Sequence, residues 1–308
     1  MDAKKRKKFL VLATVSWVLV TFSLNSAVFS SEYLHVKTSG FTRLPVSARA
    51  LGMGEAFVAV ADDYSSCHYN PAGLVHLNSR SFSSMYVDLY GLGLLTHSYF
   101  SFVEPNTGLG SGGISWSHLV ASFEPERWYA DLIAYSYAKK LFAGENVGSW
   151  GINLKYLRES TPWEDATGYS IDLAYLQRGE KLSWGICIKD VMSKIDWDTG
   201  RKENIPFNLI TGFASKISPH LLLAIDIEGS SGDIPKDVRL GTEWKLQENF
   251  SLRAGVIKKF QQENDINFAV GAGFKTHFSK VKNISFDYAF LSSEIFPSTH
   301  YISFSLAF

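Results

Sequence analysis

The chain has 308 residues, enough for one large β domain or two ordinary domains. Its 30 basic and 30 acidic residues balance, so no basic field points to nucleic acid as a partner. Aromatic residues make up 14% and charged residues 19% of the chain, which favours many short apolar segments over one compact core. A secreted β-sandwich fits the same totals, so composition alone does not choose between these classes.

Residues 1–30 have the layout of a secretory signal peptide. Basic residues fill positions 4–8, an uncharged run covers residues 9–24, and small residues follow at Ala27 and Ser30. This order predicts cleavage near Ala27 or Ser30. A retained membrane anchor is the alternative, although the run is shorter than the about 20 residues that a spanning helix needs. Removal takes away five basic residues and one acidic residue, so the mature chain is expected to be mildly acidic.

Residues 31–80 are rich in Gly, Ala and short polar residues and do not alternate cleanly. Arg49 with Asp62 and Asp63 is a candidate charge pair that pins this segment, because an enclosed charge usually needs a partner. A second feature is a predicted tight turn with exposed amides, which Pro, Asn and Gly favour together. We consider two roles for it, gating of a ligand or packing of the segment alone. This turn consists of Asn70, Pro71, Ala72 and Gly73.

From residue 81 to the end, apolar and polar residues alternate with period two, which predicts β-strands. About fourteen such segments occur, each of roughly nine to eleven residues, the length that a tilted strand needs to cross a bilayer. The last one is the clearest. Its apolar face consists of Ile302, Phe304, Leu306 and Phe308.

The connections between these segments alternate between long and short. Long ones are predicted at residues 159–166, 191–205, 229–236, 258–265 and 291–299, and tight turns at 179–181, 218–219, 247–249 and 278–281. Outer-membrane barrels have short periplasmic turns and long external loops, and aromatic residues beside the turns would form an interfacial girdle. We therefore predict an all-β fold, an antiparallel transmembrane barrel of about 14 strands over residues 81–308, located in the bacterial outer membrane and surrounded by its lipids.

A barrel of this size is too wide for its own side chains to fill. We therefore expect residues 31–80 to fold inside it as a hatch, or plug. The chain would then consist of a signal peptide (1–30), a hatch (31–80) and a barrel (81–308).

Three stretches of the hatch segment resemble the N-terminal signature of the FadL/PorV-like outer-membrane barrels, including the PorV/PorQ group. Residues 44–56 read LPVSARALGMGEA, residues 59–63 read AVADD and residues 70–74 read NPAGL. Segments at 204–209, 237–244, 252–255, 287–290 and 299–308 look like later strands of the same family, so the resemblance covers essentially the whole mature chain. The last of these segments, with Ile302, Phe304, Leu306 and Phe308 on one face, also looks like the family's barrel-assembly signal, which barrel-assembly machinery would read.

The resemblance implies a fourteen-stranded barrel with a hatch. Family members either pass fatty acids and other hydrophobic compounds across the outer membrane or act as accessory components of type IX secretion. The chain is shorter than the fatty-acid transporters and closer to the compact PorV-type members. The family resemblance makes uptake of hydrophobic small molecules our first hypothesis. The closeness to PorV-type members makes a surface scaffold for secreted proteins the alternative.

Enzymatic function is not indicated. Ser117 and His118 are adjacent, so on a strand they point to opposite faces, and His97 and His118 are too isolated to bind a metal. We expect no catalytic residues, metal or other cofactor. Cys67 and Cys187 are too few for a disulfide scaffold; they either pair with each other or remain free thiols.

Overall fold

The computed structural model describes residues 38–123, 126–142, 147–230, 233–260, 266–278, 281–292 and 297–308. The predicted signal peptide lies outside these residues. Contacts divide the chain into residues 1–40 and residues 41–308, and the second unit contains all of the strands. Among the described residues, no helix is long and apolar enough to cross a membrane.

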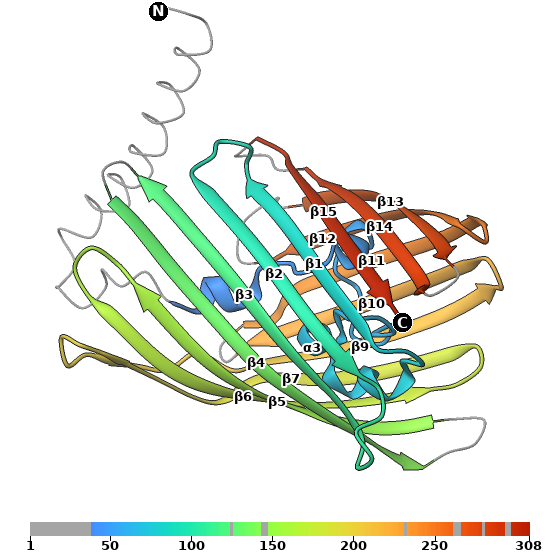
Figure 1. Cartoon of the computed structure of the whole chain (residues 1–308), viewed down its shortest axis with the longest axis horizontal. Coiled ribbons are helices and arrows are strands. Elements are labelled where there is room, and N and C mark those ends of the chain that lie inside the picture. The colour runs from blue at the N-terminus through green and yellow to red at the C-terminus, as the bar shows by residue number, and fades with distance from the viewer. Residues whose placement is uncertain are drawn as a thin grey trace, which may run out of the picture. The chain divides into compact units, whose positions relative to one another are not determined.

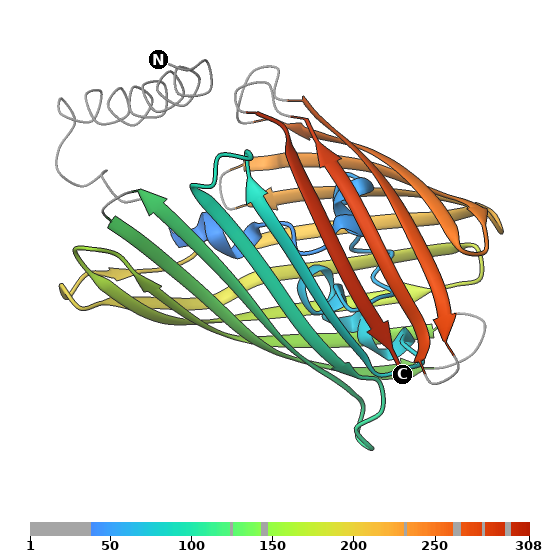
Figure 2. The ribbon, with the colours of Figure 1, turned by 45° about the horizontal axis from the view of Figure 1, so that its top comes forward.

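Fourteen long antiparallel strands form a closed ring, because β6 pairs with β7 at the ends of the strand order and β1 pairs with β15 (Figures 1 and 2). The prediction of a 14-stranded barrel is thereby confirmed. A two-residue strand, β8, adds to the edge of β7. The strands are β1 Ser81–Leu89, β2 Leu95–Glu104, β3 Ser111–Phe123, β4 Glu126–Phe142, β5 Val147–Ser160, β6 Asp165–Arg178, β7 Leu182–Trp197, β8 Lys202–Glu203, β9 Asn208–Ser218, β10 Leu221–Ser230, β11 Asp233–Gln247, β12 Phe250–Lys259, β13 Ile266–Phe278, β14 Val281–Leu291 and β15 Thr299–Ala307.

Side chains alternate between the two faces of each strand, as the period-two pattern predicted. Small and polar residues on the inner face are buried, whereas large apolar residues on the outer face are exposed, among them Tyr86 (55%), Phe268 (58%) and Ile302 (59%). A closed ring leaves no unpaired strand edge, and an apolar outer surface is stable against lipid. The ring therefore has the surface of a membrane-spanning barrel.

The barrel has two ends, which we call the turn end and the loop end. The turn end holds the start of β1, the end of β15 and the close connections of β9 to β10 and β11 to β12. The loop end holds the connections of β7 to β9, β12 to β13 and β14 to β15.

The predicted strict alternation of connection lengths is wrong in part. Half of residues 159–166 and all of the described residues in 229–236 belong to strands, since pairing extends to Ser160↔Asp165 and Ser230↔Asp233. Backbone pairing can continue beyond the apolar belt because it does not depend on apolar side chains.

Residues 41–80, which we call the inner segment, form short helices within the ring of strands, visible in blue and cyan in Figure 2. The inner segment packs closely in the barrel interior, because almost all of its apolar side chains are buried. Most of the contacts of α2 with strands fall on β12 to β15, and those of η2 on β3 to β6. The helices are η1 Thr38–Arg43, α2 Ala48–Gly52, α3 Ser66–Tyr69 and η2 Pro71–His76.

Candidate functional site

Helix α2 begins at the Ser47 cap, whose side chain accepts a hydrogen bond from the backbone of Ala50. Small residues on both sides allow the inner segment to touch the barrel wall. A Cβ on Gly241 would lie 2.2 Å from the Met53 carbonyl oxygen, and one on Gly255 would lie 2.0 Å from the Gly54 nitrogen. Wall and inner segment therefore meet backbone to backbone at this point.

Arg49 of α2 is the centre of a buried ion-pair cluster. Its Nη1 lies 2.6 Å from Asp62 and 2.9 Å from Asp63, the two residues that the sequence suggested as partners. Its Nε and Nη2 also donate to the two carboxylate oxygens of Glu243 on β11, at 2.8 and 2.9 Å. This last contact ties the inner segment to the wall, and sequence reasoning missed it. An acidic residue on the inner face of a predicted strand was the available signal.

The cluster continues around the wall. Glu243 also accepts from Arg253 on β12 at 2.7 Å, and Arg253 donates to Asp287 on β14 at 2.7 Å. Two arginines and four carboxylates thus join one helix and three strands. We call this set the Arg49 cluster: Arg49, Asp62, Asp63, Glu243, Arg253 and Asp287.

Neighbouring charges explain why Arg49 and Asp62 of the inner segment are both ionised. Burial is the largest single effect and acts to raise the pKa of Asp62, but the positive charges of Arg49 and Arg178 together hold that pKa below its ordinary value. For Arg49, burial acts to lower the pKa, and the three carboxylates around it raise the pKa well above its usual range. Both groups therefore stay charged, which favours a fixed inner segment.

A second anchor is Asp226 on the inner face of β10. Its Oδ2 accepts hydrogen bonds from the backbone nitrogens of Phe57 and Val58, at 2.8 and 2.9 Å. The inner segment therefore has two of its amides satisfied by a wall carboxylate, in a region where water does not reach them.

The turn at residues 70–73 is buried, so the prediction of exposed amides is wrong. Asn70 caps η2 by accepting from Ala72 and donates to the carbonyl oxygen of Val58 at 2.8 Å. Ser149 on β5 donates to the Ala72 carbonyl oxygen at 2.8 Å. A Cβ on Gly73 would lie 2.1 Å from the Ala61 carbonyl oxygen. Such close packing against wall and neighbour leaves no free amide for a ligand, and it supports the packing role of this turn.

Apolar side chains gather inside the barrel at the loop end. Phe41, at the start of the inner segment, lies in their midst. These side chains come from the ends of several strands that are distant in sequence. The pattern of any one segment therefore could not predict the cluster. We call it the Phe41 cluster: Phe41, Ala130, Leu132, Ala134, Leu157, Ala166, Ile195, Trp197 and Ile205.

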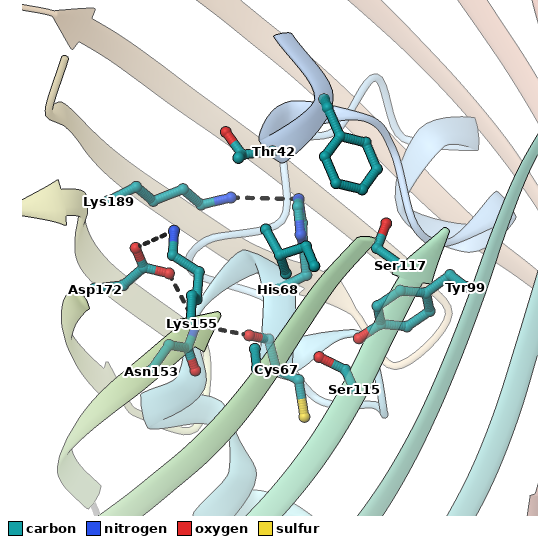
Figure 3. Close-up of a pocket in the computed structure, with 13 residues that line it drawn as sticks. Thr42, Cys67, His68, Tyr99, Ser115, Ser117, Asn153, Lys155, Asp172 and Lys189 are labelled. Atoms are coloured by element: carbon teal, nitrogen blue, oxygen red, sulfur yellow. Dashed lines mark hydrogen bonds and ion pairs between the residues drawn. The ribbon is translucent and has the colours of Figure 1, made fainter. Parts of the chain in front are cut away.

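A small cavity of about 20 Å³ adjoins the Phe41 cluster and shares Phe41, Leu132 and Ala134 with it (Figure 3). This volume is that of about one water molecule. Lys155 projects beside the cavity and lies 2.6 Å from both Asp172 and Asp190. Lys189 points toward His68, with its Nζ 3.4 Å from Nε2. The cavity is therefore lined both by charged side chains and by part of the Phe41 cluster.

Two larger cavities lie at the turn end, on either side of Asp62. One, of about 240 Å³, is lined by Arg49, Lys216 and Lys245 among others. The other, of about 230 Å³, is lined by His76 and Lys275 among others. Members of the Arg49 cluster therefore line both cavities: Arg49, Asp62 and Glu243 the first, and Asp62 and Asp63 the second.

The structure does not assemble a catalytic or metal site from the predicted candidates. Ser117 is buried on the inner face and His118 lies on the outer one, where its Nδ1 is 2.7 Å from Asp131. Ser117 instead contacts His97 at 2.6 Å, and His97 Nδ1 has no hydrogen-bond partner among the described residues. The described residues contain no group of three His, Cys, Asp or Glu side chains that could hold a metal. Cys67 and Cys187 are both buried and free.

The predicted barrel-assembly residues lie at the last strand. Ile302, Phe304 and Leu306 belong to β15, and Phe308 follows its end. Ile302 and Phe308 are exposed on the outer surface. Phe304 contacts Phe286 of β14, with ring centroids 5.0 Å apart. Reading of this strand by assembly machinery stays a prediction.

No family sequence model and no curated protein sequence matches the chain. Solved structures do. The CymD monoaromatic hydrocarbon channel has a TM-score of 0.55 at 12% identity, over 85% of this chain and 96% of its own. The toluene transporter TodX of Pseudomonas putida gives the same four values. A TodX deltaS2S3 mutant, also a monoaromatic hydrocarbon channel, has a TM-score of 0.56 at 10% identity, over 85% of this chain and 97% of its own.

These structures are FadL-family outer-membrane barrels. At such low identity the likeness concerns the fold, and at that level it agrees with the resemblance read from the sequence. Together with the apolar outer surface, it makes this chain an outer-membrane β-barrel. The closer relation to PorV-type members stays a prediction.

Proposed function

We propose that the barrel passes hydrophobic small molecules across the outer membrane, with residues 31–80 as its hatch. The Phe41 cluster carries this proposal. It is an apolar cluster inside the barrel, separate from the larger one that packs the inner segment against the wall. It lies at the loop end, which faces outward if the short connections are periplasmic. Apolar sites with a few polar groups at their base are typical of sites for small hydrophobic ligands.

Phe41 occupies the position where such a ligand would bind. Displacement of its ring would leave an apolar space lined by Leu132, Leu157 and Trp197, next to the small cavity that Lys155 and Lys189 line. Onward movement then requires the inner segment to shift, because the Arg49 cluster and the Asp226 anchor hold it across the barrel. The solved neighbours transport monoaromatic hydrocarbons or toluene, and we extend this ligand class to the present chain.

Uptake of radiolabelled toluene by cells that express the barrel tests the proposal. Phe41→Ala should increase binding and uptake because it enlarges the apolar space, and Phe41→Trp should reduce them. Phe268→Ala, on the outer surface, is the matched control and should behave as the wild type. If cells with and without the barrel took up toluene equally, and Phe41 variants had no effect, the proposal would be wrong.

A catalytic activity forms no part of this proposal, and no cofactor is invoked. The alternative, a scaffold for secreted proteins, depends only on the PorV-type resemblance. Crosslinking in intact membranes would distinguish the two functions. If the barrel is a scaffold, exported proteins should be crosslinked to it, and deletion of the barrel should cause no uptake defect.

A further inference from the structure

Lys189 on β7 carries a buried ammonium group without a carboxylate partner. The residue is 8% exposed, and among the described residues it forms no ion pair, whereas Lys155 lies 2.6 Å from both Asp172 and Asp190. Its Nζ lies 3.4 Å from His68 Nε2 (Figure 3), which is longer than the usual range for a hydrogen bond. An ammonium group has three N–H donors, so Lys189 retains donors for a further acceptor.

His68 of the inner segment acts as an acceptor toward Lys189 and adds no charge of its own. Burial first, and then the positive charges of Lys189 and Lys155, hold the pKa of His68 well below its ordinary value. The imidazole is therefore neutral and accepts through Nε2. A buried charge with unsatisfied donors is costly, so this part of the interior favours a ligand atom that accepts a hydrogen bond.

The small cavity of about 20 Å³ lies beside Lys189 and also offers an acceptor. Asn153 on β5 lines it and is 2% exposed. The Asn153 Nδ2 donates to the carbonyl oxygen of Cys67 and to Asp172, but its Oδ1 has no hydrogen-bond partner among the described residues. A hydroxyl group both accepts and donates, and a cavity with the volume of about one water molecule can hold one hydroxyl group.

The charges around the cavity favour a neutral group in it. Two cations, Lys155 and Lys189, face two anions, Asp172 and Asp190, so the set has no net charge. Asp172 lines the cavity itself, so a ligand carboxylate there would meet a like charge, and a ligand ammonium would meet the two lysines. Like charges placed against a wrong ligand are a common source of selectivity.

The apolar side of the same cavity belongs to the Phe41 cluster, through Phe41, Leu132 and Ala134. A ring in the place of Phe41 would therefore direct a short polar substituent into the cavity. We propose that the ligand of this site is a phenol or another neutral aromatic alcohol, with its hydroxyl group in the cavity that Lys189 and Asn153 line. This inference rests on the proposed function and names the ligand class of that same site.

Calorimetric titration of the full chain in a nonionic detergent at pH 7 tests the proposal with toluene, phenol and benzoate. These probes share one ring and differ in a single substituent, and phenol stays neutral at this pH, as a tyrosine side chain does. Phenol should bind at least as tightly as the more apolar toluene, and about tenfold or more tightly than benzoate. Weaker binding of phenol than of toluene, or equal binding of phenol and benzoate, would overturn the proposal.

A variant of Lys189 locates the hydroxyl site. In Lys189→Met, the ratio of phenol affinity to toluene affinity should fall about tenfold or more, as expected for loss of a hydrogen bond to a charged group. Lys194→Met is the matched control, because Lys194 lies on the same strand, pairs with Asp196 and does not line the cavity. Partitioning of the probes into micelles cancels, because all proteins are titrated in the same detergent.

Toluene binding separates the possible outcomes. If Lys189→Met binds toluene as the wild type does, it is folded, and an unchanged ratio would then overturn the proposal, as would an equal loss in Lys194→Met. If Lys189→Met loses toluene binding as well, the comparison of the three probes on the wild-type chain decides. Failure of the wild-type chain to bind or take up toluene would instead count against the proposed function.

Discussion

Arg49 of the inner segment and Glu243 of strand β11 form a two-point ion pair, with Nε to Oε2 at 2.8 Å and Nη2 to Oε1 at 2.9 Å. The side chains are almost wholly buried, with 10% and 4% exposed. They are separated by 194 residues in sequence. Planar guanidinium and carboxylate groups paired in this way fix orientation as well as distance. The pair therefore sets how the inner segment sits against the wall.

Glu243→Gln should loosen the inner segment. Removal of one partner of a buried ion pair typically costs about 3–5 kcal/mol, because the other charge stays buried without compensation. Hydrogen exchange in residues 41–63 should accelerate while exchange in the strands changes little. Glu104→Gln, which breaks the more exposed pair with Arg80, is the control and should have almost no effect. Unchanged exchange in Glu243→Gln would contradict a holding role for the cluster.

Gly73→Ala should displace the buried turn at residues 70–73. The added Cβ would lie 2.1 Å from the Ala61 carbonyl oxygen, which is backbone and cannot rotate away. We expect a lower urea midpoint for the folded barrel in micelles. Gly112→Ala is a suitable comparison, because its nearest neighbour is the flexible Thr107 side chain at 3.2 Å. Equal midpoints for the two variants would show that the turn tolerates displacement.

Cys67 should report movement of the inner segment. Burial raises the pKa of its thiol to about 12, so it should react very slowly with maleimide at pH 8. A Cys187→Ser background leaves it as the single reporter. Adding Glu243→Gln to that background should accelerate labelling, because the sulfur becomes accessible when the segment loosens. Fast labelling without the Glu243 change would mean that the segment is already mobile.

His76 should make the protein less stable in mild acid. Its pKa is about 3 in the folded chain, through burial and two neighbouring cations, against an ordinary value of 6.5. Between these values the unfolded chain binds a proton that the folded chain does not, so stability decreases as pH falls from about 6.5 toward 3. The urea midpoint should fall from pH 7.5 to pH 5, and His76→Gln should reduce that fall. A fall of the same size in both proteins would exclude His76 as its cause.

Period-two alternation predicted the barrel and its start at Ser81, because the in-and-out alternation of a strand is written directly in consecutive residues. Connection lengths were less predictable. Strands β5, β6, β10 and β11 extend into polar stretches that looked like loops, since backbone pairing rather than side-chain polarity decides where a hairpin ends.

Sequence spacing also suggested Arg49 with Asp62 and Asp63, which lie within one short segment. Glu243, Asp226 and the Phe41 cluster could not be inferred in this way. Glu243 is 194 residues from Arg49, and Asp226 is 169 residues from Phe57. The Phe41 cluster draws on four different strands, and only closure of the ring brings these partners together.

The sequence by itself determined the strands, their two faces and the presence of a segment too irregular to join the barrel, because these depend on local alternation. The tertiary structure decided which wall residues hold that segment and where the Phe41 cluster lies. The physical reason is that a side chain's burial and charge partners depend on strand register around the closed ring, which no local pattern encodes.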